Sequence, residues 1–263
     1  MRTVESGNGG TAPAVVLAVR VLEELASRGG AVTLDDLTVA VDEPRSSVHR
    51  ILNTLLQESF VQRVGARSGY RLAPRVMILG AAYLRELDLT EQFRSAATPI
   101  VLEINETMQL AVLDWPDAVF IAHVDSRRLV RLVTEIGRRV PAHASAVGKA
   151  LLAFSSMNLV ERYGELELQP VTKYTITELQ ALQAELIKTR RRGWARTFRE
   201  SDESLCCLAA PIYRSPGDPV AAISICVPEP VMSKEKEAFL AGRLVAGAKT
   251  LSSRLEDQFC ARL

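Results

Sequence analysis

The stretch DEPRSSVHRIL, residues 42–52, combines an apolar stripe with a proline, two serines, a histidine and two arginines. Val48, Ile51 and Leu52, followed by Leu55, recur at the spacing of one face of a helix. The stretch therefore predicts a helix that packs these four side chains into a core and leaves its polar residues outside.

The polar residues of this helix lie away from the apolar stripe. Ser46 and Arg50 point to the opposite side, and Ser47 and His49 lie on different flanks. Residues two apart do not face each other on a helix, and no glycine elbow surrounds the serine. We therefore exclude a Ser47–His49 catalytic pair, which leaves either a solvated face or a face that contacts DNA.

The neighbouring segments predict two more helices and a hairpin. Residues 12–28 show helical spacing up to a Gly-Gly pair, and Thr33 and Asp36 form a capping box for a short second helix. The stretch FVQRVGARSGYRLAP, residues 60–74, indicates two short strands, and three helices before a hairpin are typical of a winged helix-turn-helix. The stripe expected to be buried in the first helix is Val15, Val19, Leu22 and Ala26, and the caps expected for the third are Asp42 or Glu43, with Pro44 in its first turn.

Basic residues concentrate on the third helix and the hairpin, although the whole chain has a formal charge of only +1. Between residues 44 and 75 only Glu58 opposes them. Arginine can bind guanine through two hydrogen bonds in the major groove, and serine hydroxyls and helix N-termini suit phosphates. With the hairpin attached, this pattern favours DNA binding over a solvated face. The arginines are Arg45, Arg50, Arg63, Arg67, Arg71 and Arg75.

The composition bounds the class of protein. With 263 residues, 48% of them hydrophobic, the chain is long enough for one large or two smaller globular domains. A polar, Gly-rich N-terminus without a signal-peptide core and the lack of a transmembrane run predict a cytoplasmic, nucleoid-associated protein with no membrane contact. No cysteine sits in a CxxC pair, so we expect no metal site, no cofactor and no disulfide framework. The cysteines are Cys206, Cys207, Cys226 and Cys260.

The predicted order of helices and strands changes after an apolar helix that starts at Pro74. Its side chains Met77, Leu79 and Leu84 suit either a dimer contact or packing within the chain. Hairpins mixed with helices follow without regular βαβ alternation, which indicates an α+β sensor-like domain. We therefore expect a disordered tail in residues 1–11, a winged helix-turn-helix in 12–74, a linker helix in 75–89 and an effector-binding domain in 90–263.

Within this second domain, the pattern predicts pairs of strands between helices. Strands flank a Trp-Pro-Asp turn in 108–124 and a Ser-Pro-Gly-Asp turn in 205–228, and 128–137 is a further strand. A helix in 176–194 should be capped by Thr177 and end at Gly193. Further helices are expected at about 91–105 and 143–156 and from about residue 233.

Several motifs, in unbroken order from about Thr11 to the C-terminus, resemble the IclR family of bacterial transcriptional regulators. They are SSVHRILNTLLQESFVQRV with GYRLAP, then PAHASAVGKALLA, TITELQALQAELIKTRRRGWA and CCLAAPIYRSPGDPVAAISICVPEP. The resemblance implies a winged helix-turn-helix, a linker helix and a GAF-like domain that binds small organic or aromatic acids. It also implies homodimers, often dimers of dimers, on palindromic operators in double-stranded DNA.

The resemblance also assigns site residues. The contacts of the family's recognition helix fall on Arg45, Ser46, Ser47, His49 and Arg50, and the candidates on the wing are Arg63, Arg67 and Arg71. Effector contacts fall on Ala146, Val147, Thr197, Cys207, Ser224 and Cys226, with Leu205 as a lining residue. The amides at the start of the helix AVGKALLA can hold a carboxylate, and Ser224 and Cys226 share one face of a strand.

Two departures from the family pattern bear on the effector. Members that respond to glyoxylate or pyruvate have Asp where Thr197 stands and Ser where Cys226 stands. The DDEE run that they often carry is TFRE here, which keeps only Glu200. A pocket with fewer hydroxyls and no Asp favours a less polar ligand.

Other polar residues of the second domain have plainer interpretations. Cys206 and Cys207 should point to opposite faces of a strand, and Cys207 suits a structural or pocket-lining thiol better than a nucleophile. Lys149 suits the helix surface better than a second contact to a carboxylate. We therefore predict a ligand-responsive DNA-binding regulator without catalytic residues. The alternative is a small-molecule-binding or hydrolytic domain that uses Cys207, with the basic helix as a protein contact.

Overall fold

The computed structural model describes residues 11–65, 69–87, 89–128, 135–156, 162–163, 166–215 and 217–261. The chain divides into two compact units, Met1–Glu86 and Leu87–Leu263. Among the described helices, none has the length and apolar character that crossing a membrane requires.

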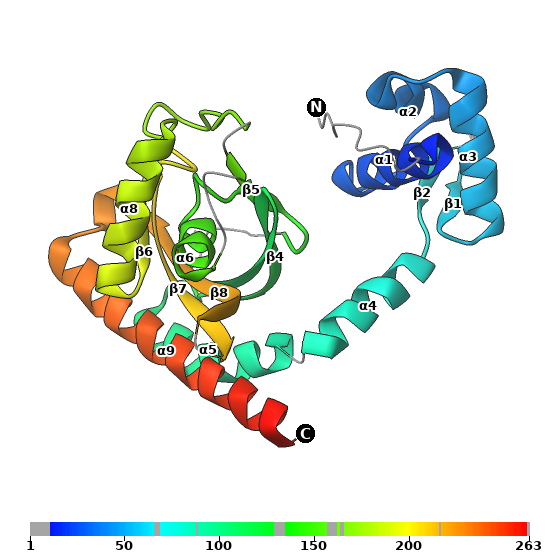
Figure 1. Ribbon diagram of the computed structural model, residues 1–263. Coiled ribbons are helices and arrows are strands. Elements are labelled where there is room, and N and C mark those ends of the chain that lie inside the picture. Colours follow the sequence, from blue (N-terminus) through cyan, green and yellow to red (C-terminus); the bar gives the residue numbers. More distant parts are fainter. Residues whose placement is uncertain are drawn as a thin grey trace. The chain divides into compact units, whose positions relative to one another are not determined.

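The N-terminal unit is a winged helix-turn-helix (Figure 1). Its β1 and β2 form an antiparallel hairpin, and Val32 joins this hairpin through a bridge to Tyr70. The predicted three helices and hairpin are therefore confirmed, and a further helix follows them. The elements are α1 (Pro13–Ser27), α2 (Leu34–Val41), α3 (Arg45–Gln57), β1 (Val61–Val64), β2 (Gly69–Leu72) and α4 (Arg75–Leu87).

Helix α3 packs with the face that its periodicity predicts. Its buried residues are Val48, Ile51, Leu52 and Leu55, which join the core of the three helices and the hairpin. Burying side chains of this size contributes about 1.5–3 kcal/mol each. This stripe therefore holds α3 to the unit and fixes which side of the helix faces solvent.

The face predicted for α1 is wrong except at Leu22, which is half-buried against the core. Leu17, Val21 and Leu25 are buried, whereas Val15 and Val19 are 61% and 47% exposed. The segment PAVVLAV is apolar around most of its circumference, so spacing alone does not choose a face. The two leucines spaced with Val21 fill the core instead.

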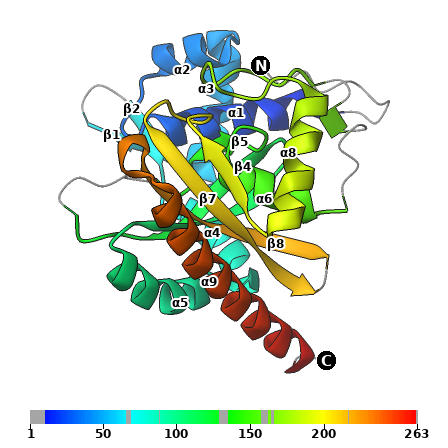
Figure 2. The ribbon, with the colours of Figure 1, turned by 90° about the vertical axis from the view of Figure 1, so that its left-hand side faces the viewer.

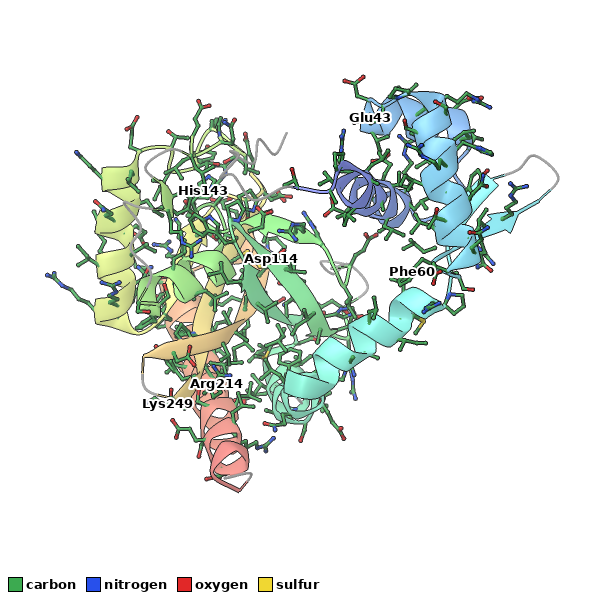
Figure 3. The ribbon with its side chains drawn as sticks, turned by 45° about the vertical axis from the view of Figure 1, so that its right-hand side comes forward. Glu43, Phe60, Asp114, His143, Arg214 and Lys249 are labelled. Carbon is green, nitrogen blue, oxygen red and sulfur yellow. A yellow bond between two sulfur atoms is a disulfide. The ribbon has the colours of Figure 1, made fainter. Side chains whose placement is uncertain are left out.

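The helix caps confirm one prediction and correct another. The Thr33 hydroxyl accepts from the Asp36 amide at 3.2 Å and caps α2 as predicted. Pro44, however, is itself the N-cap of α3, without a side-chain cap among the described residues. Asp42 is not that cap because it ends α2 in a left-handed conformation. Glu43, which Figure 3 labels, pairs with Arg20 at 3.5 Å.

Helix α4 carries an exposed apolar segment. Met77 and Leu79 are 75% and 60% exposed, so these two residues do not pack into the core of the N-terminal unit. The side chain of Leu84 lies outside the described residues.

The C-terminal unit is built on one antiparallel sheet with strand order β5-β4-β3-β8-β7-β6. Helices α5 and α9 cover one face, where α9 runs along β7 and β8, and α6 and α8 lie on the other side (Figures 1 and 2). The elements are α5 (Leu89–Ile104), β3 (Met108–Asp114), β4 (Asp117–Val124), β5 (Arg139–Pro141), α6 (Ala146–Phe154), α8 (Leu179–Arg192), β6 (Ala195–Phe198), β7 (Leu205–Ser215), β8 (Asp218–Pro228), a short 3-10 helix (Glu229–Val231) and α9 (Lys234–Ala261).

The predicted α+β class is confirmed, as are the strand pairs β3–β4 and β7–β8. The predicted strand at 128–137 falls largely on residues 129–134, which lie outside the described part of the chain. Helix α8 ends at Gly193, which has a φ of +86° as a left-handed cap requires. Thr177 does not cap this helix, since Glu178 is the N-cap and has no side-chain cap bond.

Candidate DNA-binding face and effector site

Helix α3 presents its polar residues to solvent because its apolar side chains are all used in the core. Arg45, Ser46, His49 and Arg50 are exposed, and Ser47 is half-buried. The five residues that the family resemblance assigns to DNA contact therefore all reach the surface of this helix.

The N-terminal end of α3 is suited to anions. The first amides of a helix have no acceptor within the helix, and no described side chain caps them here. An open hollow of about 600 Å³ lies at this end, lined by Leu34, Arg45, Ser46 and His49. Unpaired amides beside an arginine and a serine can bind a phosphate.

Salt bridges divide the arginines of this unit into two groups. Arg45 pairs with Asp35, and Arg75 donates to the Glu58 carbonyl oxygen at 2.7 Å and lies 3.6 Å from its carboxylate. Arg50 has no acidic partner within the described ranges. The positive charge available on α3 is therefore smaller than the sequence count indicates, and Arg50 supplies most of it.

Two of the three arginines predicted for the wing lie on the described strands of the hairpin. Arg63 and Arg71 are both exposed, on β1 and β2 respectively. The register pairs Arg63 with Tyr70, and its guanidinium lies 5.7 Å from that ring. Arg71, the next residue along, faces the other side of the hairpin. Arg67 lies outside the described residues.

In the second unit, the start of α6 is held by a close backbone contact. The Ser145 hydroxyl accepts from the Gly148 amide at 3.2 Å, and Ala146 and Val147 are buried. A Cβ on Gly148 would collide with the backbone of Ala142, so only glycine fits here. The segment before α6 therefore lies directly against its first turn.

The sheet brings the other predicted effector residues onto the face that carries α6. Thr197, Cys207 and Cys226 stand opposite one another on β6, β7 and β8, and Ser224 stands opposite Gln109 on β3. Residues paired in an antiparallel sheet share a face. The cluster on this face joins Ala146, Val147 and Cys207, with Leu205 and Cys226 packed against it.

Two hydroxyls on this face differ in their partners. Ser224 Oγ donates to Gln109 Oε1 at 3.1 Å. Thr197 is 1% exposed, and its Oγ1 has no partner among the described residues. A buried hydroxyl without a partner costs about 1–3 kcal/mol, so this atom is a natural contact for a polar group on a bound molecule.

The structure departs from the expectation of no disulfide framework at one pair of cysteines. Cys207 and Cys226 are joined, because the strand register places their Cα atoms 4.1 Å apart. Cys206 is free and faces the other side of β7, as predicted from strand alternation. A sulfur joined to another is not a thiolate, which removes the basis for Cys207 as a nucleophile in this form.

The prediction that Lys149 lies on the helix surface is also wrong. Its side chain is fully buried, and Nζ lies 2.5 Å from Glu200 Oε2. Burial lowers the pKa of Lys149 and raises that of Glu200, and each charge offsets the other in part. The hydroxyls of Thr172 and Thr175 donate to the Glu200 carbonyl oxygen, so this residue ties the end of β6 to both a loop and α6.

Histidine does not serve as a base for Cys207 among the described contacts. His143 Nε2 lies 3.0 Å from the Gln169 carbonyl oxygen, and its ring stacks edge-on against Tyr163 (Figure 3 labels His143). Burial lowers the pKa of His143. His143 therefore belongs to a neighbouring aromatic cluster rather than to the cysteine pair.

Gln109 and the Lys149–Glu200 pair are site neighbours that the sequence predictions missed. A lone polar residue in the strand MQLAV was the available signal for Gln109. The rest of the cluster on this face is small and apolar. Its residues are Ala111, Ala118, Ala150, Ala195, Ala209 and Ala222, with Phe120 and Leu151.

Comparison with known proteins covers both units. Residues 14–65 match the IclR helix-turn-helix domain, and residues 81–253 match the C-terminal domain of the bacterial transcriptional regulator IclR. The transcriptional repressor IclR of Escherichia coli K12 is 30% identical over 249 residues, which cover 92% of this chain and 90% of the relative.

Solved structures agree with this result. The IclR protein of Thermotoga maritima has a TM-score of 0.71 at 26% identity, over 93% of this chain and 99% of that one. An IclR homologue from Microbacterium hydrocarbonoxydans, complexed with 4-hydroxybenzoate, has a TM-score of 0.72 at 24% identity, over 92% and 99%. Because the family matches cover both the winged helix-turn-helix and the α+β unit, this chain belongs to the IclR family of bacterial transcriptional regulators.

Proposed function

We propose that the exposed face of α3 enters the major groove of an operator and that the hairpin contacts the adjacent backbone. Arg50 carries this proposal, because it is exposed on α3 and has no acidic partner among the described residues. Ser46, Ser47 and His49 supply further polar contacts, Arg45 joins them when it leaves Asp35, and Arg63, Arg67 and Arg71 bind phosphates.

The protein acts as a homodimer or a dimer of dimers on a palindromic site. The exposed side chains of Met77, Ile78 and Leu79 on α4 support self-association, since exposed apolar residues in a row favour a protein contact. A twofold dimer presents two copies of α3, so the spacing between half-sites follows from the dimer geometry. Such a regulator works in the cytoplasm, on the nucleoid.

The second unit binds a small organic or aromatic acid that controls operator binding. The amides of Ala146 and Val147, at the start of α6, hold the carboxylate. The unpartnered hydroxyl of Thr197 and the side chain of Ser224 contact a polar group, and Leu205 with the two cysteines lines the apolar part. The ligand acts through a difference in affinity between two states of the protein.

A thermal-shift screen of organic and aromatic acids tests the effector site, since a ligand of the folded state raises the melting temperature. 4-Hydroxybenzoate belongs in the screen because the Microbacterium homologue binds it. Stabilisation by an acid that is lost in Thr197→Val supports the site. Equal stabilisation of wild type and Thr197→Val would place the ligand elsewhere.

A gel-shift assay on DNA upstream of the chain's own and neighbouring genes tests the DNA-binding face. Retardation of one fragment that excess unrelated DNA does not abolish supports sequence-specific binding. The alternative of a hydrolytic domain that uses Cys207 predicts no specific retardation with any acid from the screen.

A further inference from the structure

Cys207 and Cys226 are held opposite each other by the sheet itself. They are paired residues on β7 and β8, with Cα atoms 4.1 Å apart, and a disulfide joins them. Opposite residues at about 4.5 Å are the non-hydrogen-bonded pairs of an antiparallel ladder, whose side chains lie closest together. Backbone pairing therefore keeps the two sulfur atoms within bonding reach whether or not they are oxidised.

The pair lies inside the candidate effector site. Thr197 stands opposite Cys207 across β6 and β7, and the Cys226 sulfur lies 3.8 Å from Gln109 Oε1. Two thiols can each donate a weak hydrogen bond, whereas a disulfide donates none. Oxidation and reduction of this pair therefore change the donors beside the position of the ligand.

We propose that Cys207 and Cys226 are a reversible dithiol–disulfide pair that sets the affinity of the effector site, an inference that rests on the proposed function of that site. The reduced form offers two S–H donors to the ligand and binds it more tightly. The oxidised form loses both donors and fixes the separation of β7 and β8 beneath the ligand. In a cytoplasmic protein, a disulfide of this kind is transient and reports the state of the thiol pool.

The oxidant of this proposal is a small disulfide such as oxidised glutathione. The Cys226 thiolate, which is half-buried and so the more accessible of the two, attacks one of its sulfur atoms and releases one small thiol. The Cys207 thiolate then attacks the Cys226 sulfur of the mixed disulfide and releases the second small thiol. Two protein thiols and one small disulfide thus become one protein disulfide and two small thiols, and reduction reverses both steps.

Cys206 provides a matched internal control. It is adjacent in sequence to Cys207, but it is buried on the opposite face of β7, opposite Val227. Burial raises the pKa of its thiol, which keeps it protonated and unreactive. A redox response that belongs to the effector site must therefore survive Cys206→Ser and disappear in Cys226→Ser.

The first test is thiol labelling of the full chain in a Cys260→Ser background. The protein is equilibrated with reduced or oxidised glutathione, denatured, alkylated and mapped by peptide mass spectrometry. We expect Cys207 and Cys226 to lose their label together in oxidised glutathione while Cys206 keeps it. Independent labelling of Cys207 and Cys226, or full labelling of both under oxidation, would overturn the pair.

The second test uses 4-hydroxybenzoate and pyruvate as probes in thermal-shift titrations of both redox forms. The half-saturating probe concentration should be about tenfold higher in oxidised than in reduced protein, as expected when two weak hydrogen bonds are lost together. Cys206→Ser should keep this difference, and Cys226→Ser should give equal values in both buffers. Equal values in both forms of the wild type overturn the regulation. If Cys207 and Cys226 lose their label together but neither probe shifts the melting temperature of either redox form, the effector site and its regulation are both refuted. The disulfide pair itself is then still supported.

Discussion

Replacing the buried lysine of the effector unit alone should destabilise the protein far more than replacing the lysine and its acidic partner together. Lys149 is fully buried against Glu200, whose carboxylate also accepts from the Ile176 amide. Lys149→Met leaves that carboxylate buried without its cation, a change that typically costs about 3–5 kcal/mol. For a domain of this size, the melting temperature should fall by roughly 6–20 °C.

The double variant Lys149→Met with Glu200→Leu distinguishes the effect of an unpaired buried charge from the effect of altered packing. Replacing a buried ion pair by apolar side chains of similar volume is often neutral or stabilising, so most of the loss should be recovered. Burial already raises the pKa of Glu200, and without Lys149 its folded pKa rises further above the unfolded value. A group with a raised folded pKa contributes stability below its unfolded pKa and loses it as the pH rises through the folded pKa. Lys149→Met should therefore regain stability on acidification from neutral pH.

Calorimetry or differential scanning fluorimetry of the four proteins in this cycle measures the coupling. Lys188→Met is the matched control, since the Lys188 side chain is 69% exposed and its ion pair with Glu185 spans 3.9 Å. It should change stability by less than about 0.5 kcal/mol. A Lys149→Met variant as stable as this control, or two single losses that simply add in the double variant, would refute the argument.

Three further changes test the effector unit. Gly148→Ala forces its Cβ against the Ala142 backbone and should cost about 1–3 kcal/mol by thermal unfolding, whereas Gly242→Ala, which meets no atom within 4 Å on α9, should be neutral or stabilising; equal effects would contradict the close contact. Reduction of the Cys207–Cys226 disulfide, with a sequence separation of 19, should remove about 3 kcal/mol and lower the melting temperature by roughly 6–12 °C, with no such change in Cys226→Ser; an unchanged wild type argues against the crosslink. Thr197→Val should keep or raise the melting temperature, because its hydroxyl has no partner among the described residues, while acid binding weakens about tenfold; a clear loss of stability would show that this hydroxyl is already bonded in the free protein.

Local sequence patterns correctly predicted the buried face of elements that are apolar on one side and polar on the other. The stripe from Val48 to Leu55 is flanked by polar residues, so its spacing defines the buried face of α3. The same reasoning failed on α1, because apolar residues there surround the helix and the choice of face depends on packing against α2 and α3.

Contacts between distant parts of the chain were not visible in the sequence pattern. Lys149 finds Glu200 across 51 positions. The apolar residues all round the helix AVGKALLAF indicate that Lys149 is buried, but they do not identify the distant carboxylate that pairs with it. Alternation predicted correctly that Cys206 and Cys207 face opposite ways. The bond to Cys226 additionally required the register of β7 against β8, which strand periodicity does not specify.

The dissociation constant for upstream DNA, measured by fluorescence anisotropy at one fixed salt concentration, tests the central claim most directly. Wild type should bind its own upstream fragment at least tenfold more tightly than a shuffled fragment, because base contacts add to phosphate binding. Arg50→Ala should lose about 1–3 kcal/mol of binding to the specific fragment. Arg28→Ala removes a charge that follows α1 and already pairs with Glu24, so this variant should bind as wild type does. Equal affinity of Arg50→Ala and wild type, or no preference for the natural fragment, would contradict the assignment of α3 as the helix that reads the operator.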